Sequence, residues 1–161
     1  MSTEYFPPTG RPAIDYAELT DAARSLIDGE SDRVANAANL SALVYQALPQ
    51  VNWVGFYFFD GHELVVGPFQ GKPACVRIPL GRGVCGAAAR TRITQRVADV
   101  HAVPDHIACD ADSRSEIVVP LVHDGELIGV FDLDSPVPDR FGADDQAGLE
   151  AIAETFIASL A

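Results

Sequence analysis

A β-hairpin near the C-terminal end is the strongest structural signal in the sequence. Residues 115–123 and 126–135 are rich in apolar and β-branched side chains, and Asp124-Gly125 between them is a favoured two-residue turn. Both segments are apolar at most successive positions, so side chains on both faces of the sheet need a cover. The hairpin therefore predicts a sheet that is covered on both faces.

The rest of the chain supplies helices and further strands. Apolar residues at helical spacing predict two N-terminal helices that begin at Asp15 and Ser31 and end at Gly29 and Pro49. The full pattern predicts helices over residues 15–28, 31–48, 84–91 and 144–160 and, besides the hairpin, strands over residues 51–60, 63–70, 74–79 and 96–100. Helices that flank a run of neighbouring strands indicate an α+β fold with an antiparallel sheet.

The chain has the length of one domain, and its charge argues against one class of partner. It has 161 residues, of which 1–12 contain three prolines and predict a flexible arm before a single domain over 13–161. The net charge of −12 repels phosphate backbones, so we expect no nucleic acid partner. No apolar run reaches the length of a membrane span, and the first residues lack the parts of a signal peptide. We therefore expect a cytoplasmic protein with no membrane contact.

An irregular polar stretch, Asp99–Pro120, leads into the hairpin and carries Cys109, His101 and His106. Irregular segments of this length in a compact domain are usually binding loops or lids, which makes the thiol a candidate for chemistry. The acidic residues beside Cys109 raise the pKa of a thiol and disfavour its thiolate form. A reactive Cys109 therefore needs a histidine or backbone donors to offset them, and the alternative is a small buried residue.

The other two cysteines are expected in the core. Cys75 falls on a predicted strand among apolar residues, and Cys85 falls in a helix of small residues. In a reducing compartment, three cysteines are more often free, catalytic or metal-binding than a disulfide framework. Zinc sites usually bring two ligands within a few residues of each other, and only His106 and Cys109 have such spacing. We expect no metal.

Two acidic residues interrupt the second strand of the hairpin. Asp132 and Asp134 share one face, and carboxylates in so apolar a strand need partners or a function, unless the strand end dips into water. With a strict two-residue turn, Glu116 lies opposite Leu133 and therefore on the other face. A bulge at Gly125 shifts the pairing by one residue and places Glu116 beside Asp132. A joint acidic site requires such a bulge, or Glu116 in the loop before the strand.

Aromatic residues alternate along the predicted strand 51–60. Trp53, Gly55 and Tyr57 share one face, and the apolar residues between them share the other. Two aromatic residues that flank a glycine predict a hollow, although aromatic residues at such positions are also common in cores and interfaces.

Three stretches carry a family resemblance: G-x-G-V-C-G-A-A at 81–88, V-A-D-V-H-A-V-P-D-H-I-A-C-D-A-D-S-R-S-E-I-V-V-P at 97–120, and G-V-F-D-L-D-S at 129–135. Together they resemble the free methionine-(R)-sulfoxide reductases, single-domain enzymes of the GAF fold. The resemblance runs from residue 52 to residue 135, with compatible helices on both sides. Generic GAF domains share the hairpin but not the three cysteines.

The resemblance implies a GAF-like fold, with a central antiparallel sheet of about six strands, the N- and C-terminal helices on one face and the active-site loops on the other. It also implies reduction of free methionine-(R)-sulfoxide without a cofactor. In the family scheme Cys109 attacks the sulfoxide, Cys75 resolves the sulfenic acid as a disulfide, and thioredoxin regenerates the thiols. Cys85 matches an auxiliary thiol of the family, whose members are often homodimers.

The remaining residues that the resemblance implies line a substrate pocket. Trp53 and Tyr57 match aromatic residues that contact the methyl and sulfur end of the substrate. The acids that hold the sulfoxide and the ammonium of the substrate are matched by Glu116, Asp132 and Asp134. A carboxylic acid that acidic neighbours keep protonated can protonate the departing oxygen, and we expect Glu116 with Asp134 in that role.

Two other functions remain open on the sequence. A ligand-binding or signalling GAF domain would bind a nucleotide or another small ligand without reductase activity. A thiol redox sensor would form the same disulfide under peroxide but would not consume sulfoxide.

Overall fold

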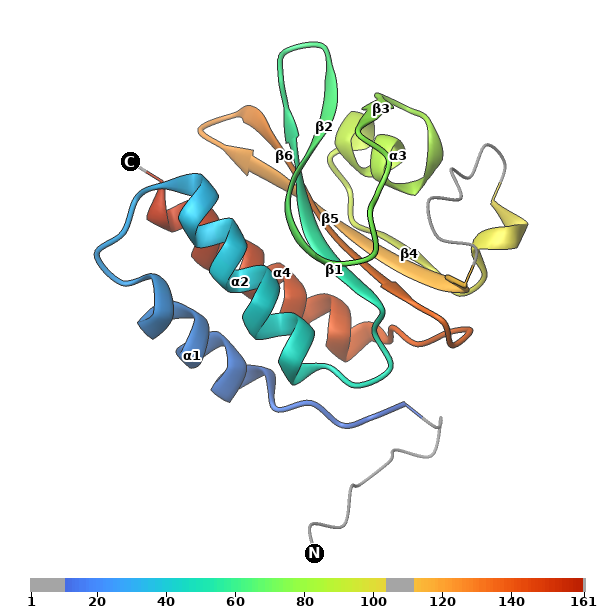
Figure 1. Ribbon diagram of the computed structural model, residues 1–161, viewed down its shortest axis with the longest axis horizontal. Helices are drawn as coiled ribbons and strands as arrows, with labels where there is room; N and C mark the ends of the chain where they lie inside the picture. Colours follow the sequence, from blue (N-terminus) through green and yellow to red (C-terminus); the bar gives the residue numbers. More distant parts are fainter. Residues whose placement is uncertain (1–10, 104–111, 161) are drawn as a thin grey trace, which may run out of the picture.

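The computed structural model describes residues 11–103 and 112–160. Its centre is an antiparallel sheet of six strands in the order β3-β2-β1-β6-β5-β4 (Figure 1). The strands are β1 Trp53–Phe59, β2 Glu63–Gly71, β3 Arg77–Pro79, β4 Gln95–Val97, β5 Ser115–His123 and β6 Glu126–Ser135. The predicted α+β class and the sheet of about six strands are confirmed. The predicted strand over 74–79 is too long, because only its last three residues pair with β2.

Helices lie on both sides of the sheet. The helices are α1 Tyr16–Ile27, α2 Arg33–Ala47, α3 Gly83–Thr91 and α4 Ala143–Ser159. The N- and C-terminal helices α1, α2 and α4 cover one face, as predicted, and α3 lies on the other (Figure 1). As predicted, the Asp15 carboxylate accepts a hydrogen bond from the Glu18 N–H at the start of α1. The expected cap of α2 at Ser31 is wrong, because the Asp32 carboxylate reaches the Ala35 N–H.

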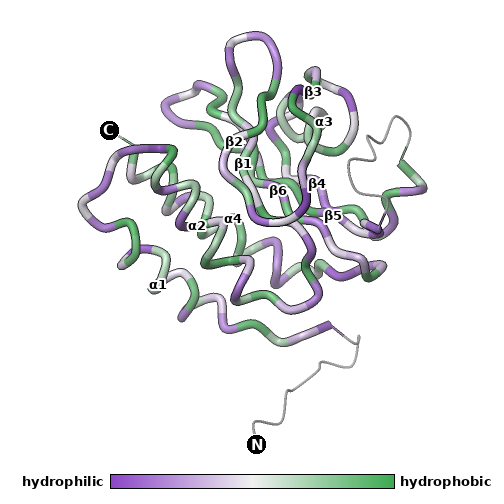
Figure 2. Tube along the Cα trace, viewed as in Figure 1, coloured by the Kyte–Doolittle hydropathy of each residue, from purple (hydrophilic) through white to green (hydrophobic). Residues whose placement is uncertain are grey.

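The strand β1 separates two hydrophobic cores, because its side chains alternate between the faces. Phe56 points to the helical layer, where its ring lies 4.8 Å from both Phe131 and Phe156. Trp53 and Tyr57 point to the opposite side and pack with residues of α3. Hydrophobic residues are concentrated along the central strands, and the peripheral loops are mostly hydrophilic (Figure 2). Both faces of the sheet are therefore covered, as the sequence of the hairpin predicts.

The register of the hairpin places Glu116, Asp132 and Asp134 on one face. Glu116 pairs with Asp134, one residue away from the pairing that a strict two-residue turn would give. The shift arises because Leu121 pairs with Gly129 and the next residue pairs with Leu127, so that the bulge falls at residue 128. Of the two arrangements that would allow a joint acidic site, the structure has a bulge. The bulge lies at residue 128 and not at Gly125, and Glu116 pairs with Asp134 and not with Asp132.

A buried polar network joins the helical layer to the first residue of β5. Arg140 is fully buried and donates hydrogen bonds to the Asp145 carboxylate and the Pro49 carbonyl. The Tyr16 hydroxyl donates to the same carboxylate over 2.6 Å, and the Arg140 N–H donates to the Ser115 hydroxyl. This network positions β5, and no sequence pattern indicated it.

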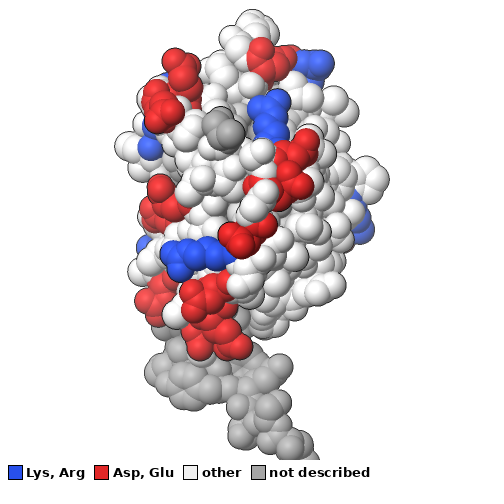
Figure 3. Space-filling model, turned by 90° about the vertical axis from the view of Figure 1, so that its left-hand side faces the viewer, with Lys and Arg blue, Asp and Glu red and all other residues white. Residues whose placement is uncertain are grey.

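The surface of the helical layer is acidic. On the face with α1 and the loop to α2, acidic side chains predominate over basic ones (Figure 3), in keeping with the net charge of −12. Within the described ranges, no helix has both the length and the hydrophobicity that crossing a bilayer requires. Most of the predicted arm 1–12 lies outside the described residues, although Arg11 forms an ion pair with Asp139. The predicted domain bounds therefore stay a prediction.

Candidate active site

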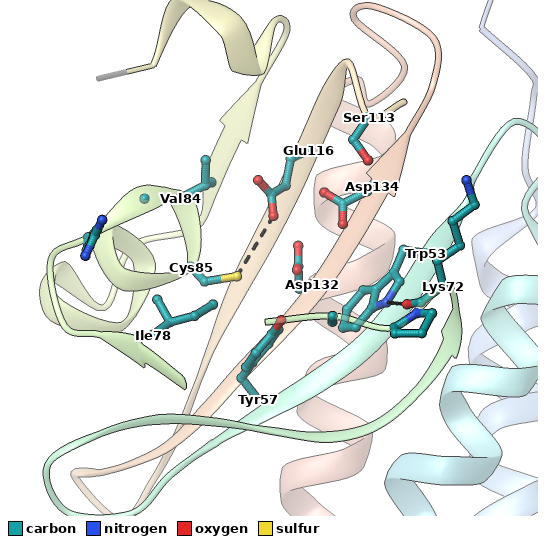
Figure 4. Close-up of a pocket in the computed structure, with 14 residues that line it drawn as sticks. Trp53, Tyr57, Lys72, Ile78, Val84, Cys85, Ser113, Glu116, Asp132 and Asp134 are labelled. Atoms are coloured by element: carbon teal, nitrogen blue, oxygen red, sulfur yellow. Dashed lines mark hydrogen bonds between the residues drawn. The ribbon is translucent and has the colours of Figure 1, made fainter. Parts of the chain in front are cut away.

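A cavity of about 40 Å³, room for only a few water molecules, opens on the α3 side of the sheet (Figure 4). Strands β1, β5 and β6 form its floor, and the start of α3 and the stretch before β3 form its walls. The predicted site residues that line it are Trp53, Tyr57, Cys85, Glu116, Asp132 and Asp134. The structure thus gathers side chains that are up to 81 positions apart in the sequence around one cavity, since the paired strands bring them together.

The aromatic wall comes from one face of β1. The Trp53 indole N–H donates a hydrogen bond to the Lys72 carbonyl over 3.1 Å, and its ring stacks 5.8 Å from the ring of Tyr57. The predicted hollow at Gly55 is absent, because the indole lies over that glycine. A Cβ atom at Gly55 would lie 2.6 Å from Trp53 Cη2 and 2.3 Å from Phe69 Cβ. The absence of a side chain at Gly55 therefore leaves room for the indole ring, and the glycine does not form a pocket itself.

The acidic floor comes from β5 and β6. Glu116 and Asp132 are about 5% exposed, and Asp134 is half-buried beside them. Burial, together with the neighbouring Asp134 carboxylate, raises the pKa of Asp132 to about 8. Burial, and then the charge of Asp132, holds the pKa of Glu116 well above its ordinary value. At neutral pH this floor can therefore carry protons that ordinary carboxylates have lost.

Cys85 faces the acids across the cavity. It is buried on α3, as predicted, and its Sγ lies 3.9 Å from Glu116 Oε2 (Figure 4). Burial, followed by the charges of Asp132 and Glu116, raises the pKa of the Cys85 thiol well above its ordinary value. The sequence predicts the burial of Cys85, but it did not indicate its polar neighbours. Ligand atoms of Cys85, Glu116 and Asp132 all lie within 4.8 Å of one another, a spacing that could hold a metal ion.

Cys75 is not among the described residues that line the cavity. Cys75 is half-buried in the stretch between β2 and β3, and not on a strand as expected; it is disulfide-bonded, whereas Cys85 is free. Cys109 and His106 lie outside the described residues. His101 is exposed in the short 3-10 helix Val100–Ala102.

Basic residues near the cavity were not predicted. Lys72 and Arg82 line it, and Lys72 Nζ forms a 3.2 Å ion pair with Asp112. Asp112 follows the segment 104–111, so this pair connects the stretch before Cys75 with the chain after Cys109. Lys72 is the only lysine in the sequence, which is the signal that could have indicated its importance.

Together the lining suits a small, charged, partly apolar molecule. Two aromatic rings offer an apolar surface, the buried carboxyl groups offer both acceptors and protons, and the basic side chains lie close to them. Such a set can bind an amine and protonate a leaving oxygen in one place.

Comparison with known proteins identifies the family. The sequence matches the model of the GAF domain over residues 17–160. The free methionine-R-sulfoxide reductase of Escherichia coli (strain K12) is 52% identical over 137 residues, which cover 85% of this chain and 83% of that protein.

Solved structures give the same result. The structure of fRMsr of Staphylococcus aureus in complex with substrate has a TM-score of 0.90 at 50% identity and covers 94% of this chain and 99% of that one. The free methionine-R-sulfoxide reductase from Neisseria meningitidis in complex with its substrate has a TM-score of 0.87 at 44% identity, covering 99% and 95%. The chain therefore belongs to the GAF-domain family, in the group that contains the free methionine-R-sulfoxide reductases.

Proposed function

We propose that this protein reduces free L-methionine-(R)-sulfoxide to L-methionine by thiol chemistry. The observation that carries the proposal is the acidic floor, in which Glu116 and Asp132 are buried and Asp134 is half-buried. This floor faces Trp53 across a cavity that is also lined by Ala74, the neighbour of Cys75 in the sequence. The named reductases among its relatives support the same activity.

The lining of the cavity supports a free amino acid as the substrate. The rings of Trp53 and Tyr57 accept the methyl and sulfur end of the molecule. The acids hold the sulfoxide oxygen and the α-ammonium, a group that methionine within a peptide lacks. We assign proton donation to the sulfoxide oxygen to Glu116 with Asp134, because the raised pKa of Glu116 keeps a proton available at neutral pH.

The proposed thiol steps need no cofactor. The sulfur of Cys109 attacks the sulfinyl sulfur, and the protonated oxygen passes to it, which releases methionine and leaves Cys109 as a sulfenic acid. The thiol of Cys75 then displaces that oxygen as water and forms a disulfide. A dithiol reductant, which we propose to be thioredoxin, exchanges with the disulfide and regenerates both thiols.

The state of the cysteines supports this pairing. Cys75 is disulfide-bonded and Cys85 is free in a chain that has three cysteines. We assign Cys85 an auxiliary role, with a side chain that helps to shape the acidic floor. A reducing compartment such as the cytoplasm, and a homodimer, remain part of the proposal.

The decisive experiment offers the separated R and S epimers of free methionine sulfoxide to the reduced protein. We expect methionine from the R epimer alone. Cys109→Ser should abolish turnover, and Cys75→Ser should allow one turnover per chain and then stop. Full steady-state turnover in Cys109→Ser would exclude the proposal.

The same assay separates the two alternatives. Tight nucleotide binding with no methionine formed would indicate a ligand-binding GAF domain. Disulfide formation under peroxide with no sulfoxide consumed would indicate a redox sensor.

A further inference from the structure

We propose that Cys85, Glu116 and Asp132 form a binding site for a thiophilic divalent cation such as Zn²⁺, and that the bound ion closes the pocket. A metal bound here would inhibit the enzyme, since the proposed reaction needs no metal. The binding claim stands on the geometry alone, whereas the inhibition rests on the proposed function.

The distances between the three ligand atoms are close to those that tetrahedral coordination requires. They lie within 4.8 Å of one another, and Cys85 Sγ is 3.9 Å from Glu116 Oε2. With Zn–S near 2.3 Å and Zn–O near 2.1 Å, tetrahedral ligands lie about 3.4 to 3.6 Å apart. Movements of about 1 Å or less by these side chains would therefore complete three ligand positions.

An unsatisfied buried oxygen points independently to a missing cation. Asp132 is 4% exposed, and its Oδ1 has no hydrogen-bond partner among the described residues. A buried carboxylate oxygen without a partner is costly, so a cation or a donor at this position stabilises the structure. The Asp132 carboxylate lies in the cavity between Glu116 and the ring of Tyr57 (Figure 4), where an ion entering from the cavity would reach it.

The donor set selects the kind of cation. A thiolate favours Zn²⁺ or Cd²⁺ over Mg²⁺ and Ca²⁺, which prefer oxygen ligands alone. On binding, metal–ligand bonds replace the S–H bond of Cys85 and the O–H bond of any carboxyl group that holds a proton, and these protons leave to solvent. The two carboxylates and one thiolate more than neutralise the charge of the ion. The cavity leaves a fourth position for water, as in sites that three protein ligands form.

A metal at this site competes directly with the substrate. The ion occupies the carboxylate oxygens that we assign to the substrate's ammonium and sulfoxide oxygen. We therefore expect Zn²⁺ to inhibit the reductase competitively, with no need to bind Cys75 or Cys109.

The test uses the protein with its disulfide formed, in which Cys85 is the free thiol of the described residues. Cd²⁺ is titrated while the sulfur-to-metal charge-transfer absorption in the ultraviolet is followed. We expect one Cd²⁺ per chain, displaced by Zn²⁺ and not by Mg²⁺. Cys85→Ser should remove the absorption, and Asp132→Asn should weaken binding at least tenfold. Asp124→Asn, which changes an exposed acid of the hairpin turn, should bind as the unmodified protein does.

Two results would overturn the site. One is the absence of the charge-transfer absorption in the disulfide form, because the proposed site supplies its thiolate from Cys85, which is free in that form. The other is unchanged affinity in Asp132→Asn. Thermal unfolding offers a readout without absorption: Zn²⁺ should raise the Tm of the disulfide form and leave that of Cys85→Ser unchanged. Binding with no competitive inhibition would remove only the claim of pocket closure, and it would leave the proposed reductase activity intact.

Discussion

Replacement of Asp132 by asparagine should stabilise the protein at neutral pH, although it removes a residue that we assign to substrate binding. The folded protein raises the pKa of Asp132 from 3.8 to about 8 because the group is buried beside Asp134. Between these two values the unfolded chain gives up this proton while the folded chain keeps it. The unfolded state then binds fewer protons than the native state, so the carboxyl group makes the free energy of unfolding fall as pH rises.

The size of the effect follows from the pKa shift. Each pH unit above the unfolded pKa costs about 1.4 kcal/mol until the folded pKa is reached. At pH 7 the ceiling is therefore on the order of 4 kcal/mol. The asparagine amide must find its own hydrogen bonds, which offsets part of the gain. We expect a net gain of at least about 1 kcal/mol at pH 7, or a rise in Tm of about 2 to 4 °C for a domain of this size.

The assay is thermal unfolding of Asp132→Asn and the unmodified protein from pH 4 to pH 8, with both in the same disulfide state. The advantage of the variant should grow with pH and become small near pH 4, where the unfolded chain also keeps much of this proton. Asp124→Asn, a change at an exposed acid, should shift Tm by only a small amount. The reasoning is refuted by a variant that is less stable than the unmodified protein at pH 8, or equally advantaged at pH 4 and pH 8.

Three further predictions test the wall of the pocket and the buried network. Gly55→Ala places a methyl group within 2.6 Å of the Trp53 indole and should raise KM and lower the free energy of unfolding by about 1 to 3 kcal/mol, measured by steady-state kinetics and urea unfolding. Trp53→Ala should raise KM for the sulfoxide at least tenfold, and Trp53→Phe should recover most of the loss; equal KM values for the two variants would contradict an apolar wall. Arg140→Met leaves the buried Asp145 carboxylate without its cation and should cost about 3 kcal/mol in urea unfolding, whereas the exposed change Arg24→Met should cost less than about 0.5 kcal/mol.

Local patterns were sufficient to predict much of the fold. The alternation along β1 correctly separated Trp53 and Tyr57 from the helical core, because side chains in a strand must point to opposite faces. The Asp124-Gly125 turn predicted the hairpin, since both residues adopt the positive φ that such a turn requires. The family resemblance assigned the acids, the aromatic residues and the cysteines to one active site.

The interior of the site depended on contacts between distant segments. The bulge at residue 128, and with it the pairing of Glu116 with Asp134, follows from how β5 meets β6, and the turn alone suggested another position. The approach of Cys85 to Glu116 spans 31 positions and requires α3 to pack on the sheet. The strongly raised pKa of the acids exists only where folding excludes water from carboxylates that lie side by side. Residue type and spacing determine which face a side chain occupies, whereas its neighbours across the cavity, and therefore its protonation, are decided by tertiary packing.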